Sequence, residues 1–246
     1  MPKPKIRTMT SRDWSQQPPY IYPPYKSSVL RGPTRELVKL APLYASHDSI
    51  AGELLGDLSG IYQANPLDGD LTRNGRKGAA PVGERIIVSG RVIDEFGGAV
   101  AGALVEIWQA NASGRYLHKV DQHDAPLDPN FLGAGRAITD RDGRYRFYTI
   151  KPGAYPWGNH ANAWRPQHIH FSVIAATIAS RLVTQMYFPG DPLLEYDPIF
   201  QSVPGPAQKN LIGHFDLGLT EADFALGYHF DIVLAASNDS AADIEK

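Results

Sequence analysis

From Glu84 onward, the chain consists of short segments rich in apolar, β-branched and aromatic residues, each separated from the next by turn-forming residues. Residues 104–108 and 144–148 alternate apolar and polar side chains, which is typical of strands with one buried face. The sequence Asp-Arg-Asp-Gly at 140–143 predicts a turn before the second of them. We expect further strands at 86–94, 168–173, 182–188 and 229–234. This series predicts an all-β protein with an antiparallel β-sandwich core, long loops and a few short helices.

The N-terminal region is dominated by proline, as in Pro-Pro-Tyr-Ile-Tyr-Pro-Pro-Tyr at 18–25. Prolines at this density exclude a helix or a central strand over residues 1–35 and predict an extended arm. The aromatic residues suit an arm that packs on a partner subunit, and a freely solvated tail is the alternative. Short helices are expected at 34–40 and 49–58, followed by an irregular loop at 63–83. We therefore divide the chain into an N-terminal region at 1–83, a β-sandwich domain at 84–236 and a disordered tail at 237–246.

Composition excludes several classes of function. The net charge is −2 and the basic residues are scattered, so the chain lacks the concentrated positive face that nucleic acid requires. There is no cysteine, which excludes disulfides, iron–sulfur clusters, thiolate metal sites and cysteine nucleophiles. No apolar run approaches the roughly 20 residues that span a bilayer, and no hydrophobic stretch follows the basic N-terminus. These features predict a cytoplasmic protein that binds neither nucleic acid nor membrane.

His168 and His170 lie two residues apart in an expected strand, so both side chains leave the same face while Ile169 and Phe171 point to the core. This spacing suits a metal held by one strand, although two half-buried structural histidines would give the same pattern. Arg165 lies three residues earlier and could stabilise an anionic substrate or intermediate. The alternative for Arg165 is an ordinary surface ion pair.

Two tyrosines stand out by their surroundings. Tyr155 lies in the rigid loop Pro-Gly-Ala-Tyr-Pro-Trp at 152–157, and Tyr116 lies in the loop that leaves the strand ending at Trp108. Two phenolates and two neutral imidazoles would supply hard oxygen and borderline nitrogen donors, which suit ferric iron, whereas phenolates are uncommon ligands of zinc. Most buried tyrosines, however, only pack and satisfy one hydrogen bond, so a structural role is the alternative.

Several longer segments resemble intradiol ring-cleavage dioxygenases, over residues 20 to 235. Within that family, the chain is most similar to the iron-carrying β subunits of members that act on 3,4-dihydroxybenzoate. The similar segments are Val-Glu-Ile-Trp-Gln-Ala-Asn-Ala at 105–112, Gly-Arg-Tyr at 114–116, Leu-Asp-Pro-Asn-Phe at 127–131, Thr-Ile-Lys-Pro-Gly at 149–153, Trp-Arg-Pro-Gln-His-Ile-His-Phe at 164–171, Tyr-Lys-Ser-Ser-Val-Leu-Arg at 25–31 and Phe-Pro-Gly-Asp-Pro-Leu at 188–193.

The resemblance implies a role for each matching residue. The four ligands of one non-haem Fe(III) per chain would be Tyr116, Tyr155, His168 and His170. Tyr155 would leave the metal when the substrate binds, and Arg165 would be catalytic. Residues lining the substrate pocket or its mouth would be Tyr25, Arg31, Trp157 and Gln185. Two positions depart from the family: Gly158 stands where Arg is frequent, and Leu117 replaces a residue that is commonly basic.

The resemblance also implies an activity and partners. The expected reaction is cleavage of 3,4-dihydroxybenzoate by O2 to give 3-carboxy-cis,cis-muconate, in aromatic-compound catabolism by the β-ketoadipate route. A homologous α subunit that lacks the iron ligands would form αβ units with this chain in a larger oligomer. The alternatives are an intradiol dioxygenase acting on catechol or hydroxyquinol, and a non-catalytic β-sandwich subunit. The extended arm counts against the first, and the retention of all four ligands counts against the second.

Overall fold

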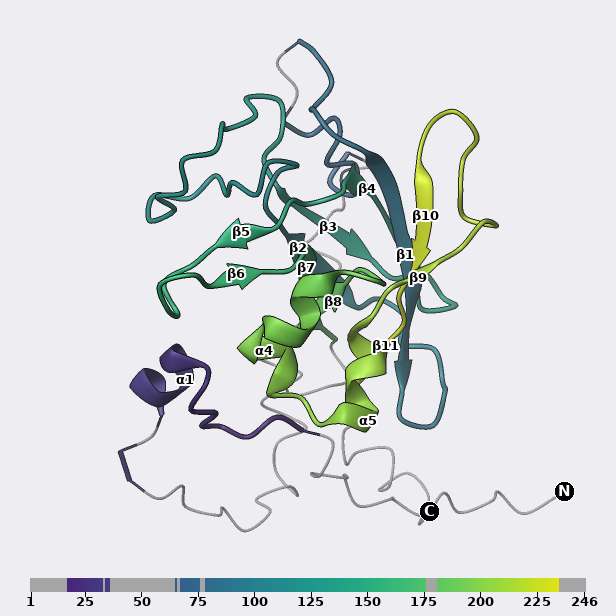
Figure 1. The fold of residues 1–246 in the computed structure, drawn as a ribbon. Coiled ribbons are helices and arrows are strands. Elements are labelled where there is room, and N and C mark those ends of the chain that lie inside the picture. The colour runs from purple at the N-terminus through teal and green to yellow at the C-terminus, as the bar shows by residue number, and fades with distance from the viewer. Residues whose placement is uncertain are drawn as a thin grey trace, which may run out of the picture.

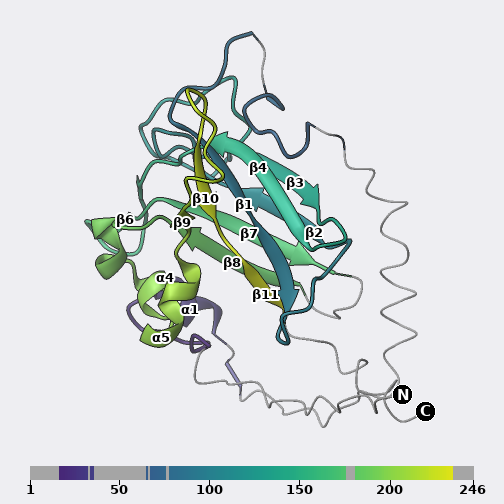
Figure 2. The same ribbon diagram turned by 90° about the vertical axis from the view of Figure 1, so that its right-hand side faces the viewer.

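The computed structural model describes residues 17–32, 34–35, 65, 67–75, 78–175 and 181–234. In this part of the chain, two β-sheets pack face to face, a two-stranded hairpin projects from one side, and short helices lie together at one end (Figures 1 and 2). The architecture is therefore the all-β sandwich that the sequence predicts. No described helix is long and apolar enough to cross a membrane.

The first sheet is built around its longest strand, β1 (Arg85–Asp94). On one side β1 pairs antiparallel with β4 (Arg144–Ile150). On the other side it pairs in parallel with β10 (Leu226–His229) and then with β11 (Ile232–Leu234), while β9 (His214–Phe215) extends the sheet beyond β10. The sandwich is thus mostly antiparallel, but the two pairings of β1 with the C-terminal strands are parallel, which periodicity within one segment cannot reveal.

The second sheet has the order β3-β2-β7-β8 and is antiparallel throughout. Its strands are β2 (Leu104–Trp108), β3 (Ala134–Ile138), β7 (His168–Ile174) and β8 (Leu182–Tyr187). The expected strands at 104–108, 168–173 and 182–188 are confirmed, as are those at 86–94 and 144–148 in the first sheet. The sequence did not predict β3, because Ala-Gly-Arg-Ala-Ile has little β propensity and forms a strand through its pairing with β2.

The core lies between the two sheets, and both contribute large side chains to it. The main cluster of buried residues includes Ile86, Val88, Val105, Ile107, Tyr145, Phe147, Ile169, Phe171, Val173, Met186, Tyr228 and Phe230. Since neighbouring side chains alternate along a strand, the core positions Ile169 and Phe171 place His168 and His170 on the opposite, outer face of the second sheet. The strand that builds the core therefore also carries the candidate ligands.

The remaining elements surround that outer face. The hairpin joins β5 (Tyr155–Pro156) to β6 (Trp164–Arg165). The helical elements after β8 are the 3-10 helix η2 (Pro192–Tyr196), α4 (Pro198–Gln201), α5 (Gly205–Gln208) and the 3-10 helix η3 (Lys209–Leu211). They lie near α1 (Lys26–Arg31), the one helix of the described N-terminal residues (Figure 2).

Helix α1 corrects the expectation that residues 1–35 are extended throughout. No proline lies between Pro24 and Pro33, and Lys26–Arg31 contains neither proline nor glycine, so its backbone amides are available until Gly32 ends the helix. The helices expected at 34–40 and 49–58 and the tail at 237–246 fall outside the described residues, apart from Thr34 and Arg35, which form a bend. The described parts of the loop at 63–83 are mainly turns. The division into three regions stays a prediction.

The expected strand at 229–234 is interrupted at Phe230 and Asp231, and Gly90 of β1 lies opposite the interruption. The register is the same on both sides, with Ser89 opposite His229 and Val92 opposite Ile232. Within the break, the Phe230 N–H donates to the Ser89 carbonyl at 2.9 Å. The Asp231 side chain accepts from the Arg91 N–H at 2.7 Å. A Cβ on Gly90 would lie 1.8 Å from the Phe230 carbonyl oxygen, so the break requires glycine there.

We therefore expect Gly90→Ala to lower the free energy of unfolding by about 1–3 kcal/mol, since the new methyl group would force the Phe230 carbonyl aside. Gly205→Ala is the matched control, because a Cβ at Gly205 meets no atom within 4 Å. Urea denaturation measures both variants. Equal midpoints for the two variants would contradict this account of the break.

The buried hydroxyl of Tyr145 should make the free energy of unfolding depend on pH in the alkaline range. This hydroxyl donates to the Phe230 carbonyl, and burial, aided by Asp231, raises the pKa of Tyr145 well above its ordinary value. Because the folded pKa exceeds the unfolded one, the protonated phenol stabilises the fold below about pH 10, and this contribution is lost as pH rises further. The stability advantage of the wild type over Tyr145→Phe should shrink by about 1.4 kcal/mol per pH unit above pH 10. Urea unfolding between pH 8 and 11 checks it, and a constant difference would refute it.

Candidate metal centre

Four side chains that the sequence singled out converge at one place on the outer face of the second sheet. The Nε2 atoms of His168 and His170 are 3.2 Å apart, and the Tyr155 hydroxyl lies 3.3 Å from His168 Nε2. The Tyr116 ring meets the Tyr155 ring edge-on, with centroids 5.2 Å apart, and lies 6.4 Å from the His170 ring. The Tyr155 oxygen and the two histidine nitrogens thus lie close together, with the Tyr116 ring beside them, and they come from three separate segments of the chain.

Strand β7 fixes the two histidines through its neighbours on the outer face. Trp108 of β2 lies opposite His170 and stacks on it, with ring centroids 4.8 Å apart and planes only 1° from parallel. On the other side, Gln185 and Tyr187 of β8 lie opposite His170 and His168, respectively. The antiparallel register therefore places the histidine pair between Trp108 on one side and Gln185 and Tyr187 on the other.

The loop that carries Tyr116 is organised by the buried side chain of Asn111. Asn111 Oδ1 accepts hydrogen bonds from the backbone N–H groups of Ser113 and Arg115, at 3.0 and 2.9 Å. Its Nδ2 donates to the Pro126 carbonyl at 2.9 Å, which ties the returning loop to the same point. Polar side chains that bond to nearby backbone in this way fix turns without regular secondary structure.

The same asparagine also holds the loop that carries Tyr155. The Asn111 carbonyl accepts from the N–H groups of both Gly114 and Gly153, at 3.0 and 2.9 Å. Gly114 has φ +80°, and a Cβ there would lie 2.1 Å from the Ala154 carbonyl oxygen, so the two loops approach this closely only with glycine. The backbone carbonyl of Asn111 and the glycine at 114 thus bring the two tyrosine-bearing loops together.

Both histidines are neutral, and His168 presents an unprotonated nitrogen to the site. His168 Nδ1 lies 2.6 Å from the Pro166 carbonyl, which can only accept, so Nδ1 carries the proton and Nε2 has a free lone pair. Burial, then Arg165 and His170, hold the pKa of His168 well below its ordinary value. Burial and Arg165 lower the pKa of His170 to about 3. At 3.2 Å apart, the two Nε2 atoms are close enough to bind one cation between them.

The tyrosines need that cation as well. Burial, together with Tyr155, raises the pKa of Tyr116 well above its ordinary value, and the Tyr116 hydroxyl is buried without a hydrogen-bond partner in the described part of the chain. Burial also raises the pKa of Tyr155, while Arg165 opposes this. Among the described residues, no group of three His, Asp or Glu side chains could hold a metal. The four donors therefore fit a hard, highly charged cation that ionises the phenols.

Arg165 lies beside the ligands and is almost completely buried, with 3% of its surface exposed. Its Nη2 donates to Gln185 Oε1 at 2.7 Å, to Asp197 Oδ2 at 2.9 Å and to the Tyr187 hydroxyl at 3.1 Å. Burial works to lower the pKa of Arg165, but Tyr187 and Asp197 raise it beyond its ordinary value. The guanidinium is thus a permanent positive charge, not the surface ion pair that was the alternative.

The residues expected at the substrate pocket form a continuous row. Arg165 lies over the Trp157 ring at 5.5 Å, and Trp157 lies 5.7 Å from the Tyr25 ring. The Tyr25 hydroxyl accepts from Arg31 Nη2 at 2.5 Å. Gln185 bonds to Arg165, so the predicted pocket residues form one series of contacts that leads outward from the cluster of donors to Arg31. Whether these side chains contact a substrate stays a prediction.

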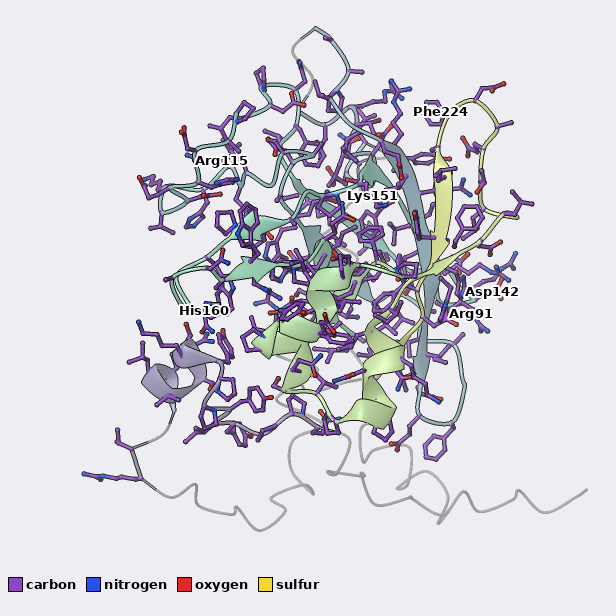
Figure 3. All side chains as sticks on the ribbon, in the orientation of Figure 1. Arg91, Arg115, Asp142, Lys151, His160 and Phe224 are labelled. Atoms are coloured by element: carbon purple, nitrogen blue, oxygen red, sulfur yellow. The ribbon has the colours of Figure 1, made fainter. Side chains whose placement is uncertain are left out.

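The N-terminal arm is held in place by Asn159 in the turn of the hairpin. Asn159 Oδ1 accepts from the Lys26 N–H at 2.9 Å, and Nδ2 donates to the Pro24 carbonyl at 2.8 Å. Figure 3 shows the neighbouring His160 beside α1, while Arg115 lies on the opposite side of the hairpin. The arm therefore packs on its own chain at Tyr25, so it is not a free tail there.

The two departures from the family pattern lie at the edge of this region. A side chain at Gly158 would meet no atom within 4 Å, so its space is open. Leu117 is 60% exposed. Neither position contributes to the cluster of four donors.

Sequence reasoning missed Trp108, Tyr187 and Asp197 as parts of this site. Tyr187 could have been found, because it follows Gln185 by two residues in a strand and therefore shares its face. Asp197 precedes Pro198, which marks a helix start but gives no indication of a contact with Arg165. A separate cavity of about 390 Å³ lies beyond Trp108 on the same face, lined in part by Glu106, Arg136 and Arg181. Its charged groups pair with one another or with Asp68.

Comparison with known proteins gives a consistent result. A family model described as "Dioxygenase" matches residues 59–236, and one described as "Protocatechuate 3,4-dioxygenase beta subunit N terminal" matches residues 11–43. The chain is 60% identical over 234 residues to the protocatechuate 3,4-dioxygenase beta chain of Burkholderia cepacia, covering 92% of this chain and 93% of the relative. It is 35% identical over 131 residues to hydroxyquinol 1,2-dioxygenase of Rhizobium sp. (strain MTP-10005), covering 48% of this chain and 42% of that protein.

Solved structures agree with the observed fold. The structure of 3-chlorocatechol 1,2-dioxygenase from Rhodococcus opacus 1CP matches with a TM-score of 0.51 and 26% identity. The match covers 63% of this chain and 62% of that chain.

We expect Asn111→Ala to lower the free energy of unfolding by about 1–3 kcal/mol, because several buried backbone groups lose their partner. The variant should also bind less metal per chain after identical loading, since the loop of Tyr116 loses the side chain that ties Ser113 and Arg115 to Pro126. Urea denaturation and elemental analysis measure the two effects. The control is Asn162→Ala in the exposed turn of the hairpin. Metal binding at the wild-type level in Asn111→Ala would show that Asn111 does not organise the site.

Proposed function

Because this chain belongs to the intradiol ring-cleavage dioxygenase family, we propose that it cleaves 3,4-dihydroxybenzoate with O2 to give 3-carboxy-cis,cis-muconate. Both oxygen atoms enter the product and no external reductant is needed. The observation that carries the proposal is the convergence of Tyr116, Tyr155, His168 and His170, in a chain 60% identical to a protocatechuate 3,4-dioxygenase beta chain. This activity places the protein in the catabolism of aromatic compounds, by the β-ketoadipate route.

Intradiol dioxygenases use non-haem iron, and we assign Fe(III), one per chain, to the four converging donors. Two ionised phenols and two neutral imidazoles form a donor set that favours the ferric state. When bound, ferric iron supplies Lewis acidity, which lowers the pKa of the catechol hydroxyls and orients the ring. The neutral state of His168 and His170 means that neither needs to lose a proton before binding the metal.

Tyr155 supplies the base in this proposal. Its oxygen lies at the edge of the cluster, 3.3 Å from His168 Nε2, and Arg165 lowers its pKa against the effect of burial. The Tyr155 phenolate can accept one of the two catechol protons as the substrate binds, which makes it a general base built into the site. Tyr116 is more deeply buried, and the Tyr155 oxyanion disfavours its ionisation, so the two tyrosines are not equivalent.

Arg165 acts by electrostatics. Its guanidinium is held in a buried place next to the donors, where a positive charge is worth more than in water. It stabilises the negative charge that develops on the ring of the substrate. Trp157 and Gln185 flank Arg165 and would contact the substrate ring, and Tyr25 and Arg31 of the N-terminal arm would stand at the mouth of the pocket.

We further propose a homologous α subunit as the partner of this chain. The 60% identical relative is named a beta chain, which implies a second kind of subunit. The aromatic arm also suits an intersubunit contact, because Tyr20 is 77% exposed and Leu30 of α1 is 75% exposed. The two subunits would form αβ units in a larger oligomer.

The protein loaded with iron in air, and co-expressed with its candidate partner, should be red, because phenolate-to-iron charge transfer absorbs visible light. Adding 3,4-dihydroxybenzoate without O2 should shift the band, and admitting O2 should give one 3-carboxy-cis,cis-muconate per O2 consumed. Faster turnover of catechol or hydroxyquinol would instead assign the chain to the other substrates of this family. A colourless protein without iron after loading would favour the non-catalytic subunit.

Tyr155→Phe should retain iron but bind the substrate about 100-fold more slowly, because the phenolate that accepts a proton is absent. His170→Ala should lose most of its iron. Tyr148→Phe is the control, since Tyr148 bonds to Glu221 away from the cluster and should leave both properties unchanged. Stopped-flow absorbance without O2 measures the binding rate. Unaltered kinetics in Tyr155→Phe would rule out its role as a base.

A further inference from the structure

Asp197 is a completely buried carboxylate next to the candidate site, at the start of α4. It forms a buried ion pair with Arg165, with 2.9 Å between Asp197 Oδ2 and Arg165 Nη2. We propose that Asp197 is the positioning residue of Arg165: it holds the guanidinium in the orientation that serves the reaction. This inference rests on the proposed function, because it deepens the role of Arg165 in that reaction.

The hydrogen bonds around the guanidinium are distributed unevenly. Three acceptors, from Gln185, Tyr187 and Asp197, all lie within 3.1 Å of the single atom Nη2. Arg165 Nε, in contrast, is buried without a hydrogen-bond partner among the described residues. One corner of the guanidinium is therefore anchored, while the other corner keeps a donor that only a ligand or water could satisfy.

Asp197 is itself held rigidly. Its second oxygen, Oδ1, accepts from the Ile199 N–H at 3.2 Å and so caps α4, which begins with Pro198. The Tyr187 hydroxyl donates to Oδ2 at 3.2 Å and lies 3.0 Å from Gln185 Oε1. The carboxylate thus connects the start of a helix to strand β8 and to Arg165. A group fixed at both ends can fix the side chain that pairs with it.

The charge of Asp197 matters as much as its place. Gln185 and Tyr187 are neutral, so Asp197 is the one carboxylate bonded to Arg165 among the described residues. A buried guanidinium without a paired carboxylate is costly, and it would shift toward water or toward the Tyr155 oxygen. Asp197 therefore keeps the cation buried in its place beside Tyr155, the tyrosine that acts as a base.

Asp197→Asn tests the proposal with little change of shape. Asparagine is as good an N-cap as aspartate, so the start of α4 is retained while the charge at Arg165 is removed. We expect kcat per bound iron to fall about 10- to 100-fold, as for other residues that orient a functional group by hydrogen bonding to it. The affinity for 3,4-dihydroxybenzoate without O2 should change less than threefold. The variant loses stabilisation of the negative charge that develops on the substrate ring during the reaction, which is after binding.

A double-mutant cycle with Arg165→Met separates positioning from a general structural effect. If Asp197 acts through Arg165, then Asp197→Asn should have no further effect on kcat in the Arg165→Met background. The wild type, the two single variants and the double variant should also be unfolded in urea without metal. Asp197→Asn should lower the urea midpoint less in the Arg165→Met background than in the wild type. Arg165→Lys replaces Arg165→Met in both cycles should the latter fail to fold.

Asp191→Asn is the matched control. Asp191 also caps a short helix that begins with proline, accepting from the Leu193 N–H at 2.9 Å, and its other oxygen accepts from the Gln167 N–H at 2.8 Å instead of from Arg165. This variant should lower the urea midpoint but leave kcat per iron within about threefold of the wild type, as expected of a residue without a role in positioning.

The outcomes are distinct. The proposal is supported if Asp197→Asn lowers kcat in the wild type but not in the Arg165→Met background. The urea midpoints of the metal-free proteins should show the same dependence on Arg165. A kcat per iron at the wild-type level in Asp197→Asn overturns it, as does an equal loss in both backgrounds. If the wild type does not cleave the ring, the proposed function has failed, and the metal-free unfolding cycle alone then decides whether Asp197 holds Arg165.

Discussion

The position of β7 between β2 and β8 is the constraint on which the rest of the structure depends. Antiparallel pairing on both sides fixes the register, so that Ile169 and Phe171 enter the core while His168 and His170 face outward. A shift of one residue would exchange these two sets. The apolar residues therefore keep the histidines in place, because burying His168 and His170 in the core instead would cost far more than it gains.

Electrostatics then gives the outer face its chemistry. The neutral imidazoles and the phenols with raised pKa values lie in a buried place that has one permanent cation, Arg165, and one carboxylate paired with it, Asp197. Because Asp197 is paired with Arg165, its negative charge does not serve the four donor atoms. A highly charged metal ion would bind all four donors at once, which explains why this buried polar cluster persists in the folded protein.

The strands could be predicted because their burial follows a period of two, and the His-X-His pair could be predicted because the same period places both side chains on one face. The tyrosines stood out by the loops that carry them, but only the resemblance to the family implied that they are ligands, since most buried tyrosines only pack and form one hydrogen bond. The attachments through Asn111 and Asp197 could not be predicted. They join residues 42 positions apart, as between Asn111 and Gly153, or 32 apart, as between Arg165 and Asp197. The parallel pairing of β1 with β10 was missed for the same reason.

The sequence by itself determined the fold class, the extent of the main strands and the four candidate ligands, because these are written in local alternation and in long motifs shared with a family. Only the tertiary structure decided that the donors meet, that Arg165 is buried and paired, and that helix α1 follows the prolines and packs near Trp157. The physical reason is that burial, pKa and hydrogen-bond partners are properties of the space around a side chain. That space is filled by segments far away in the chain, so no local pattern records it.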